Sequence, residues 1–210
     1  MSDASNRIRI LIADDHTLLR EGIAGLIADE SDMTLVGEAA NGREAIEQFR
    51  KHHPDVTLMD LQMPKMSGLD AMISIRGEFP EARIIVLTTY MGDVQVLRAL
   101  KAGARAYLLK NTLRTELLRT IRAVHEGNKT LSPEVSFQLV EHAAEETLSP
   151  TEVRVLRLIA DGNSNKEIAV KLSATEDTVK GQVRSILSKL NANDRAHAAI
   201  IAVKRGIIEL

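Results

Sequence analysis

Short apolar segments alternate with amphipathic segments along the first 127 residues of the chain. The apolar segments are Ile8–Ala13, Thr34–Ala39, Asp55–Met59, Arg83–Thr88 and Ala104–Leu109. The segments that follow them have helical periodicity and cover His16–Glu30, Arg43–His52, Leu69–Phe79, Val94–Ala102 and Leu113–Glu126. Strands that alternate with helices in this way predict a doubly wound parallel sheet, a (βα)5 fold of the α/β class. Helices cover both faces of such a sheet, which explains why the strands are almost continuously apolar.

The pattern changes after Gly127. The sequence Ser132–Glu134 predicts the start of a short helix that ends near His142, because it places serine at the cap and proline at the first helical position. The acidic segment Ala143–Thr147 is interpreted as a linker. We therefore expect a first domain over residues 1–127, a linker with a short helix over 128–146, and a second domain over 147–210.

Helix start signals recur throughout the second domain. Ser149 and Ser164 each stand three residues before a glutamate, which is the capping-box pattern. Thr175 and Asp194 are predicted to cap a third and a fourth helix, and Gly206 is placed to end the last one. Four short capped helices predict a small all-α domain.

The composition excludes several classes of protein. The chain has 210 residues, of which 44% are hydrophobic and only 2% are aromatic, so the cores must be aliphatic. It has no cysteine, which excludes a disulfide framework and thiolate metal sites. No apolar run approaches the roughly 18 residues that span a membrane, and the first residues lack the apolar stretch of a signal peptide. We expect a cytoplasmic protein without a membrane partner.

The net charge of -2 hides an asymmetry between the first and the last part of the chain. Residues 148–210 contain ten Lys and Arg against seven Asp and Glu, a net charge of +3, which leaves -5 on the remainder. An acidic first part and a mildly basic second part suggest different partners.

Five polar side chains stand at the carboxyl ends of predicted strands. Asp14 and Asp15 follow the first strand, and Asp60 follows the third. Thr88 ends the fourth strand and Lys110 follows the fifth. Because ligands of parallel α/β sheets bind beyond the carboxyl ends of the strands, we expect these groups to converge on one edge.

The three carboxylates predict a magnesium site. Like charges this close repel each other unless a cation neutralises them, and Mg²⁺ prefers oxygen ligands. We expect Asp15 and Asp60 to be direct ligands, Asp14 to act through water, and a backbone carbonyl near Gln62 to complete the set. Asp60 is also the best candidate for a nucleophile toward phosphorus, with the Lys110 ammonium and the Thr88 hydroxyl neutralising the phosphoryl charge.

These residues lie in motifs that resemble the receiver domain of bacterial response regulators. The motifs are "LIADDH", "LMDLQMPKMSGLDA", "IIVLTTY" and "GARAYLLK", within roughly residues 7–127. The resemblance implies that Asp60 accepts a phosphoryl group from a sensor histidine kinase, and that Thr88 and Lys110 are the switch hydroxyl and the invariant lysine. It also implies that Tyr107 is the switch aromatic, although a plain edge-strand aromatic remains the alternative. Many receivers have proline after the lysine; here Asn111 follows, so we expect a trans peptide.

The second domain contains a helix-turn-helix pattern. Ile168, Ala169 and Leu172 form the apolar face of a first helix, and a short turn leads to Thr175. The apolar stripe of the second helix is Val179, Val183, Ile186, Leu187 and Leu190, and its polar face carries Lys180, Gln182, Arg184, Ser185 and Lys189. Such a polar face is typical of a recognition helix in the DNA major groove, and a solvated surface helix is the alternative.

The segments "LSPTEVRVLRLIADGNSNKEIA" and "TVKGQVRSILSKL" resemble the LuxR-type DNA-binding domain of the NarL/FixJ subfamily. The resemblance implies DNA contacts by Lys180, Gly181 and Arg184. Gly181 is a departure, because many members have valine there and glycine offers no methyl contact to thymine. The helix predicted near Asp194–Lys204 resembles the dimer helix of the family, with packing onto its own domain as the alternative.

The combined reading is a two-component response regulator, not an enzyme, that binds promoter DNA under the control of Asp60 phosphorylation and forms a homodimer on activation. One alternative is a Mg²⁺-dependent phosphatase with an aspartyl-phosphate intermediate. Hydrolases of that kind carry Asp-x-Asp on one strand, whereas Leu61 and Gln62 follow Asp60. Another alternative is a constitutive DNA-binding protein whose receiver only dimerises, but the complete acidic set argues against it.

Overall fold

The structure of the chain is a computed structural model that describes residues 7–89, 93–111, 113–131, 136 and 147–208. The chain folds into two compact units, each described by itself. The later division between them falls between residues 136 and 137, inside the segment 128–146 that the sequence assigns to the linker. Most of the helix predicted from Ser132 to His142 lies outside the described residues.

The first unit is built on a parallel sheet with the strand order β2-β1-β3-β4-β5-β6. The strands are β1 (Ile8–Ala13), β2 (Met33–Ala39), β3 (Val56–Asp60), β4 (Ile84–Thr88), β5 (Ala106–Leu109) and β6 (Thr130–Leu131). The five predicted strands are confirmed with shifts of one or two residues at some ends. The last strand was not predicted, and it pairs with Ala106 and Tyr107 of β5.

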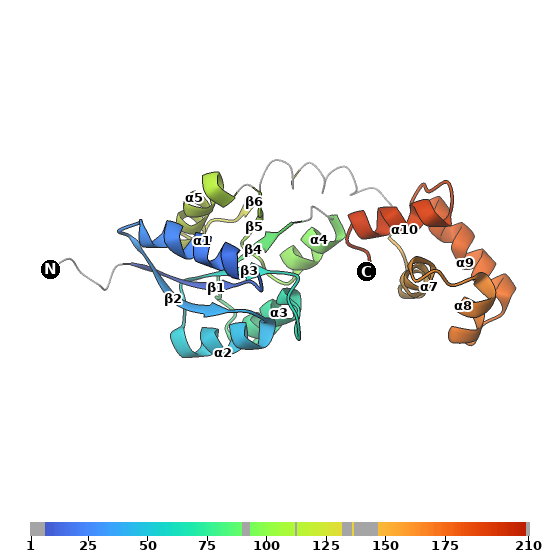
Figure 1. The fold of residues 1–210 in the computed structure, drawn as a ribbon, viewed down its shortest axis with the longest axis horizontal. Coiled ribbons are helices and arrows are strands. Elements are labelled where there is room, and N and C mark those ends of the chain that lie inside the picture. The colour runs from blue at the N-terminus through green and yellow to red at the C-terminus, as the bar shows by residue number, and fades with distance from the viewer. Residues whose placement is uncertain (1–6, 90–92, 112, 132–135, 137–146, 209–210) are drawn as a thin grey trace. The chain divides into compact units, whose positions relative to one another are not determined.

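Helices cover both faces of the sheet, as the doubly wound pattern predicts. They are α1 (Thr17–Ala28), α2 (Gly42–His52), α3 (Gly68–Glu78), α4 (Asp93–Lys101) and α5 (Leu113–His125). Figure 1 shows α1 and α5 on one face of the sheet and α2 and α3 on the opposite face. The strand order changes direction between β1 and β3, because β2 pairs with one edge of β1 while β3 and the later strands lie at its other edge. The chain therefore leaves β1 toward one face of the sheet, where it forms α1, and leaves β3 toward the opposite face, where it forms α3 (Figure 1).

The core of the first unit is aliphatic, as the low aromatic content requires. All residues of β3, β4 and β5 are buried, whereas most residues of the edge strand β2 are half-buried. On the face of α1 and α5, Ile23 and Ile121 join a cluster with sheet residues such as Leu58. Burial of this apolar surface, at about 25 cal/mol per Å², is the main favourable contribution to folding of the unit.

The second unit contains four described helices, α7 (Pro150–Ala160), α8 (Asn165–Lys171), α9 (Glu176–Lys189) and α10 (Arg195–Lys204). Each begins at the residue that the sequence indicates, because Ser149, Ser164, Thr175 and Asp194 all accept a hydrogen bond from a backbone N–H three residues on. The two serines form complete capping boxes. The helix α9 contacts α7, α8 and α10, and Val179, Ile186 and Leu190 face the shared core.

None of the helices in the described part of the chain has the length and apolar composition needed to cross a membrane.

Candidate functional site

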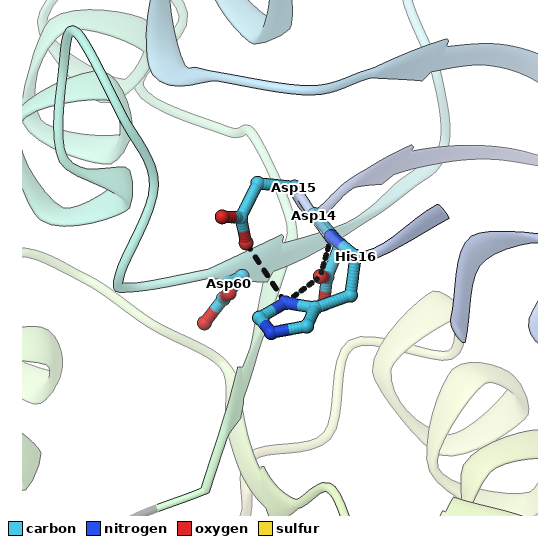
Figure 2. Close-up of side chains that lie close together, drawn as sticks. All are labelled: Asp14, Asp15, His16 and Asp60. Carbon is cyan, nitrogen blue, oxygen red and sulfur yellow. Dashed lines mark hydrogen bonds and ion pairs between the residues drawn. The ribbon is translucent and has the colours of Figure 1, made fainter. Parts of the chain in front are cut away.

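The reversal in strand order between β1 and β3 brings the acidic residues together. Asp14 comes directly after β1, and Asp60 is the last residue of β3. Oxygen atoms of Asp14, Asp15 and Asp60 and a ring nitrogen of His16 all lie within 4.8 Å of one another. Figure 2 shows these four side chains gathered at one place beside the strand ends. The three carboxylates therefore converge at the strand ends, as the sequence predicts.

Asp14 is fully buried and held on several sides. Its backbone N–H donates to the carbonyl of Ala39 at 3.0 Å. Its Oδ1 accepts a hydrogen bond from the backbone N–H of His16 at 2.9 Å, and its Oδ2 lies 2.8 Å from Nζ of Lys110. Asp14 thus holds its carboxyl group in a fixed position at the base of the site.

Lys110 bridges the two buried carboxylates. Its Nζ donates to Oδ2 of Asp60 at 2.8 Å and lies equally close to Asp14, and the side chain is only 10% exposed. The lysine is held in place because its backbone N–H donates to the carbonyl of Thr88 at 2.7 Å. The other Asp60 oxygen, Oδ1, accepts from the backbone N–H of Gln62 at 3.2 Å. The peptide after Lys110 is trans, as Asn111 predicts.

Burial and charge act against each other at this site. Burial raises the pKa of Asp60, and the nearby Asp14 adds to this effect, while the Lys110 ammonium opposes it. For Lys110 burial favours the neutral amine, but hydrogen bonds to Asp14 and Asp60 outweigh burial and raise its pKa, so the ammonium stays charged. The site is thus two buried carboxylates that share one fixed cation.

Thr88 and Tyr107 lie on neighbouring strands next to the acidic cluster. Thr88 is the buried last residue of β4, and the buried Tyr107 lies on the adjacent strand β5. Burial raises the pKa of Tyr107 to about 12, so the phenol is neutral at physiological pH. Tyr107 is completely buried, and its strand is flanked by both β4 and β6. The alternative of an edge-strand aromatic therefore does not describe its surroundings.

Two exposed residues, Asp15 and His16, form the rim of the site. Asp15 is 34% exposed and His16 is 66% exposed, and Nδ1 of His16 lies 2.9 Å from Oδ1 of Asp15. His16 was not among the site residues predicted from the sequence, although it directly follows Asp15. Gln62 contributes a backbone N–H to Asp60, whereas its carbonyl as a metal ligand stays a prediction.

The donor set of the site suits a hard divalent cation. The clustered carboxylates of Asp14, Asp15 and Asp60 supply oxygen atoms, the ligands that Mg²⁺ prefers. Lys110 carries the only cationic group that the described residues place against both buried carboxylates. The acidic cluster therefore fits Mg²⁺ binding.

In the second unit, α9 presents a polar surface away from its core. Lys180, Gly181 and Arg184 are exposed, and Gln182 is half-buried. A side-chain carbon added at Gly181 would meet no atom within 4 Å, so packing does not require this glycine. Lys180 forms exposed ion pairs with Glu176 and Asp177 at 3.2 and 3.4 Å, which are weak and easily exchanged.

Ser185 and Lys189 of α9 have partners on another helix. Both lie on the polar face of α9 that was predicted from the sequence, and both contact the buried Glu152 of α7. Oε1 of Glu152 accepts from Ser185 Oγ at 2.6 Å, and its Oε2 accepts from Lys189 Nζ at 2.9 Å. A helical periodicity separates polar from apolar positions, yet it cannot show which polar positions meet a neighbouring helix. Lys189 thus stabilises the packing of α9 on α7.

Two family models match the chain over most of its length. The response regulator receiver domain matches residues 10–122, and the luxR family of bacterial regulatory proteins matches residues 146–202. The first covers the strands and helices that build the acidic site, and the second covers α7 to α9 and most of α10.

Similar proteins share this two-part organisation. YhcZ of Bacillus subtilis (strain 168), an uncharacterized transcriptional regulatory protein, is 42% identical over 206 residues, which are 94% of this chain and 96% of the relative. The response regulator protein VraR of Staphylococcus epidermidis is 37% identical and covers 96% of this chain and 99% of its own. RcsB of Salmonella enterica serovar Typhimurium, solved bound to a promoter with the phosphomimetic BeF3-, is 29% identical, with a TM-score of 0.73 and coverage of 95% of this chain and 99% of its own. The chain therefore belongs to the response regulator family of transcriptional regulators, with a receiver domain followed by a LuxR-type helix-turn-helix domain.

Proposed function

We propose that phosphorylation of Asp60 by a sensor histidine kinase controls the binding of this regulator to promoter DNA. The observation that carries the proposal is the shared contact of Lys110 with Asp14 and Asp60. It places a fixed ammonium and a second carboxylate beside a buried carboxylate at the strand ends. This arrangement suits phosphoryl transfer, which depends on positioning and charge neutralisation more than on covalent machinery.

The residues of the site have distinct roles in the transfer. An oxygen of Asp60 attacks the phosphorus of a phosphohistidine, so that a P–O bond forms as the P–N bond breaks and the imidazole leaves with its electron pair. Lys110 neutralises negative charge on the phosphoryl oxygens, and the Thr88 hydroxyl donates a hydrogen bond to one of them. Mg²⁺ held by Asp14, Asp15 and Asp60, with the Gln62 carbonyl as a further ligand, supplies the remaining positive charge when bound. Self-dephosphorylation of Asp60 is the expected return step.

Thr88 and Tyr107 form the switch in this proposal. Both side chains are buried on the paired strands β4 and β5, so a movement of the Thr88 hydroxyl toward the phosphoryl group alters the surroundings of the Tyr107 phenol. Phosphorylation then shifts a pre-existing equilibrium between two receiver states. The active state favours a homodimer on a two-fold symmetric DNA site.

The DNA-binding surface in this proposal is the exposed side of α9. Lys180, Gly181, Gln182, Arg184 and Lys189 face the major groove, and Lys189 also holds the helix against Glu152. RcsB, which is similar over 95% of this chain, was solved as dimers on DNA, and this supports the assignment. The partners are a sensor kinase and promoter DNA, and the proposed location is the cytoplasm.

The helix α10 is proposed as the dimer helix of the second unit. Ala198 and Ala202 face its own core, so part of the helix serves internal packing. Ile200 is 54% exposed and offers an apolar contact to a second copy.

Phosphorylation by a small phosphoryl donor tests whether Asp60 is the acceptor. The full-length chain is incubated with acetyl phosphate and Mg²⁺, and intact mass spectrometry counts the added phosphoryl groups. We expect one group on the wild type and on Asp29→Ala, a control at an exposed helix end, and none on Asp60→Ala. Labelling of Asp60→Ala at the wild-type rate would remove Asp60 as the acceptor.

The coupling to DNA is tested with the same samples. Labelled and unlabelled protein are titrated onto promoter DNA in a gel-shift assay, and we expect tighter binding by the labelled form. Equal affinities would instead favour a constitutive DNA-binding protein.

A further inference from the structure

Arg20 of α1 links three structural elements beside the acidic site. Its Nη1 donates to the backbone carbonyl of Asp14 at 2.6 Å. Its Nε donates to Oε2 of Glu38 on β2 at 3.3 Å, and its Nη2 donates to the Thr17 hydroxyl at 3.5 Å. The Arg20 side chain is only 15% exposed, so the guanidinium is held among these partners and is not a freely solvated charge.

These contacts fix the main chain of Asp14 at both of its polar groups. The N–H of Asp14 donates to the carbonyl of Ala39, and the carbonyl of Asp14 accepts from Arg20. Glu38 and Ala39 are the last two residues of β2, so the same strand end anchors Asp14 directly and through Arg20. The carbonyl of Asp14 belongs to the peptide that joins it to Asp15, which means that Arg20 orients this peptide.

The direction of the Asp15 carboxylate depends on that peptide. Asp15 is 34% exposed, and its side chain contacts the still more exposed ring of His16. Asp14 and Asp60, in contrast, have their carboxylates set by the buried Lys110. The rim of the site therefore takes its geometry from the backbone more than from side-chain packing.

We propose that Arg20 is a positioning residue for the divalent cation, because it orients the Asp14–Asp15 peptide so that the Asp15 carboxylate faces Asp60. The inference rests on the proposed cation site formed by Asp14, Asp15 and Asp60. Partners that orient the ligands of a metal commonly change its affinity by roughly 10- to 100-fold when they are removed.

The direction in which cation affinity changes on removal of Arg20 distinguishes a positioning role from a purely electrostatic one. Arg20 is a positive charge close to an acidic site, and by Coulomb's law its removal alone would strengthen cation binding. Loss of the orienting hydrogen bond would weaken cation binding. The substitution Arg20→Met keeps most of the side-chain volume and removes both the charge and the donors, so the two mechanisms predict opposite changes.

Calorimetric titration of the full chain with magnesium chloride tests the proposal. We expect the dissociation constant for Mg²⁺ to rise about 10-fold in Arg20→Met. We expect a smaller rise in Arg20→Lys, because one ammonium keeps the charge but cannot reproduce the donor fork. The matched control is Arg50→Met, which breaks the exposed ion pair between α2 and Glu78 of α3 and should leave Mg²⁺ binding unchanged.

A second readout follows acetyl phosphate labelling as a function of magnesium concentration. In Arg20→Met the magnesium concentration that gives half of the maximal labelling rate should rise, while the labelling rate at saturating magnesium approaches that of the wild type. General unfolding would not produce this combination. If Arg20→Met does not fold, as judged by circular dichroism, Arg20→Lys decides the question. Wild-type or tighter Mg²⁺ binding by the folded variants overturns the inference. A wild-type chain that binds no Mg²⁺ and accepts no phosphoryl group would defeat the proposed function instead.

Discussion

At the scale of single residues, Gly68 shows how closely the backbone packs behind the acceptor. It is the first residue of α3, and its N–H donates to the carbonyl of Leu61 at 3.0 Å. A side-chain carbon at this position would lie 1.8 Å from the carbonyl oxygen of Asp60 and 2.8 Å from its carbonyl carbon. Both are backbone atoms, so either α3 or the end of β3 would have to move.

We predict that Gly68→Ala destabilises the first unit and slows phosphoryl labelling of Asp60. The steric clash should outweigh the gain of about 1 kcal/mol that alanine brings over glycine in a helix. The control is Gly77→Ala in the same helix, where an added carbon meets no atom within 4 Å and stability should rise. Urea unfolding followed by circular dichroism measures both variants, and equal stabilities would contradict the packing argument.

Sequence reasoning identified the residues of the site whose position follows from a strand end. Asp14, Asp60, Thr88 and Lys110 end or follow parallel strands, and the geometry of such sheets brings strand ends together. Arg20 could not be found in this way. It lies inside a helix, and its contact with Asp14 exists only because α1 folds back over its own loop and the end of β2.

At the scale of elements, one buried carboxylate connects two helices of the second unit. Oε2 of Glu152 accepts from the backbone N–H of Ser149 at 2.6 Å and from Lys189, and its Oε1 accepts from Ser185. The side chain is 5% exposed. Glu152 therefore caps the start of α7 and at the same time fixes the C-terminal half of α9, the proposed recognition helix.

This hydrogen-bond network makes the stability of the second unit depend on pH in the acidic range. Burial alone would raise the pKa of Glu152, but hydrogen bonds from Ser185, Ser149 and Lys189 outweigh burial and lower the pKa to about 2. A carboxyl whose pKa is lower in the folded state stabilises the fold fully above its ordinary pKa of 4.5. That contribution is lost progressively as the pH falls from 4.5 toward 2.

We predict that Glu152→Gln lowers the stability of α7 and α9 at neutral pH by about 1.5 to 3 kcal/mol, since it removes the charge-assisted hydrogen bond between the carboxylate and the Lys189 ammonium. The variant should also lose part of the acid dependence below pH 4.5. Hydrogen exchange with mass spectrometry on the full chain reads these helices separately from the first unit. Glu167→Gln changes the other, exposed capping box and should have a much smaller effect, so similar losses in both variants would refute the special role of Glu152.

Local signals were sufficient for most of the helices and strands but not for all. The caps at Ser149, Ser164, Thr175 and Asp194 begin helices in the structure because each side chain satisfies a free N–H of its own first turn. The strand β6 has two residues, which is too short to show alternation, and its pairing with β5 depends on the tertiary fold. The contacts of Ser185 and Lys189 with Glu152 could not be predicted for the same reason, because their partner lies on another helix.

At the scale of the whole molecule, the helical segment over residues 148–210 differs in charge from the rest of the chain. Residues 148–210 carry a net charge of +3, and the rest of the chain, which contains the acidic site, carries -5. DNA phosphates attract the first of these and repel the second, so DNA affinity should depend on cations of the second unit. A net charge of this size is small, and the placement of individual cations must therefore matter more than their number.

The salt dependence of DNA binding tests that placement. Each phosphate contact contributes a slope of roughly -0.9 to the logarithm of the binding constant against the logarithm of salt concentration. We predict that Lys180→Ala with Arg184→Ala weakens binding to any duplex and reduces the slope by up to about two. Arg154→Ala with Arg157→Ala removes the same charge from exposed positions of α7 and serves as the control. If both double variants lose the same slope, net charge and not the surface of α9 governs binding. If only the first loses it, α9 is the element that meets the phosphates.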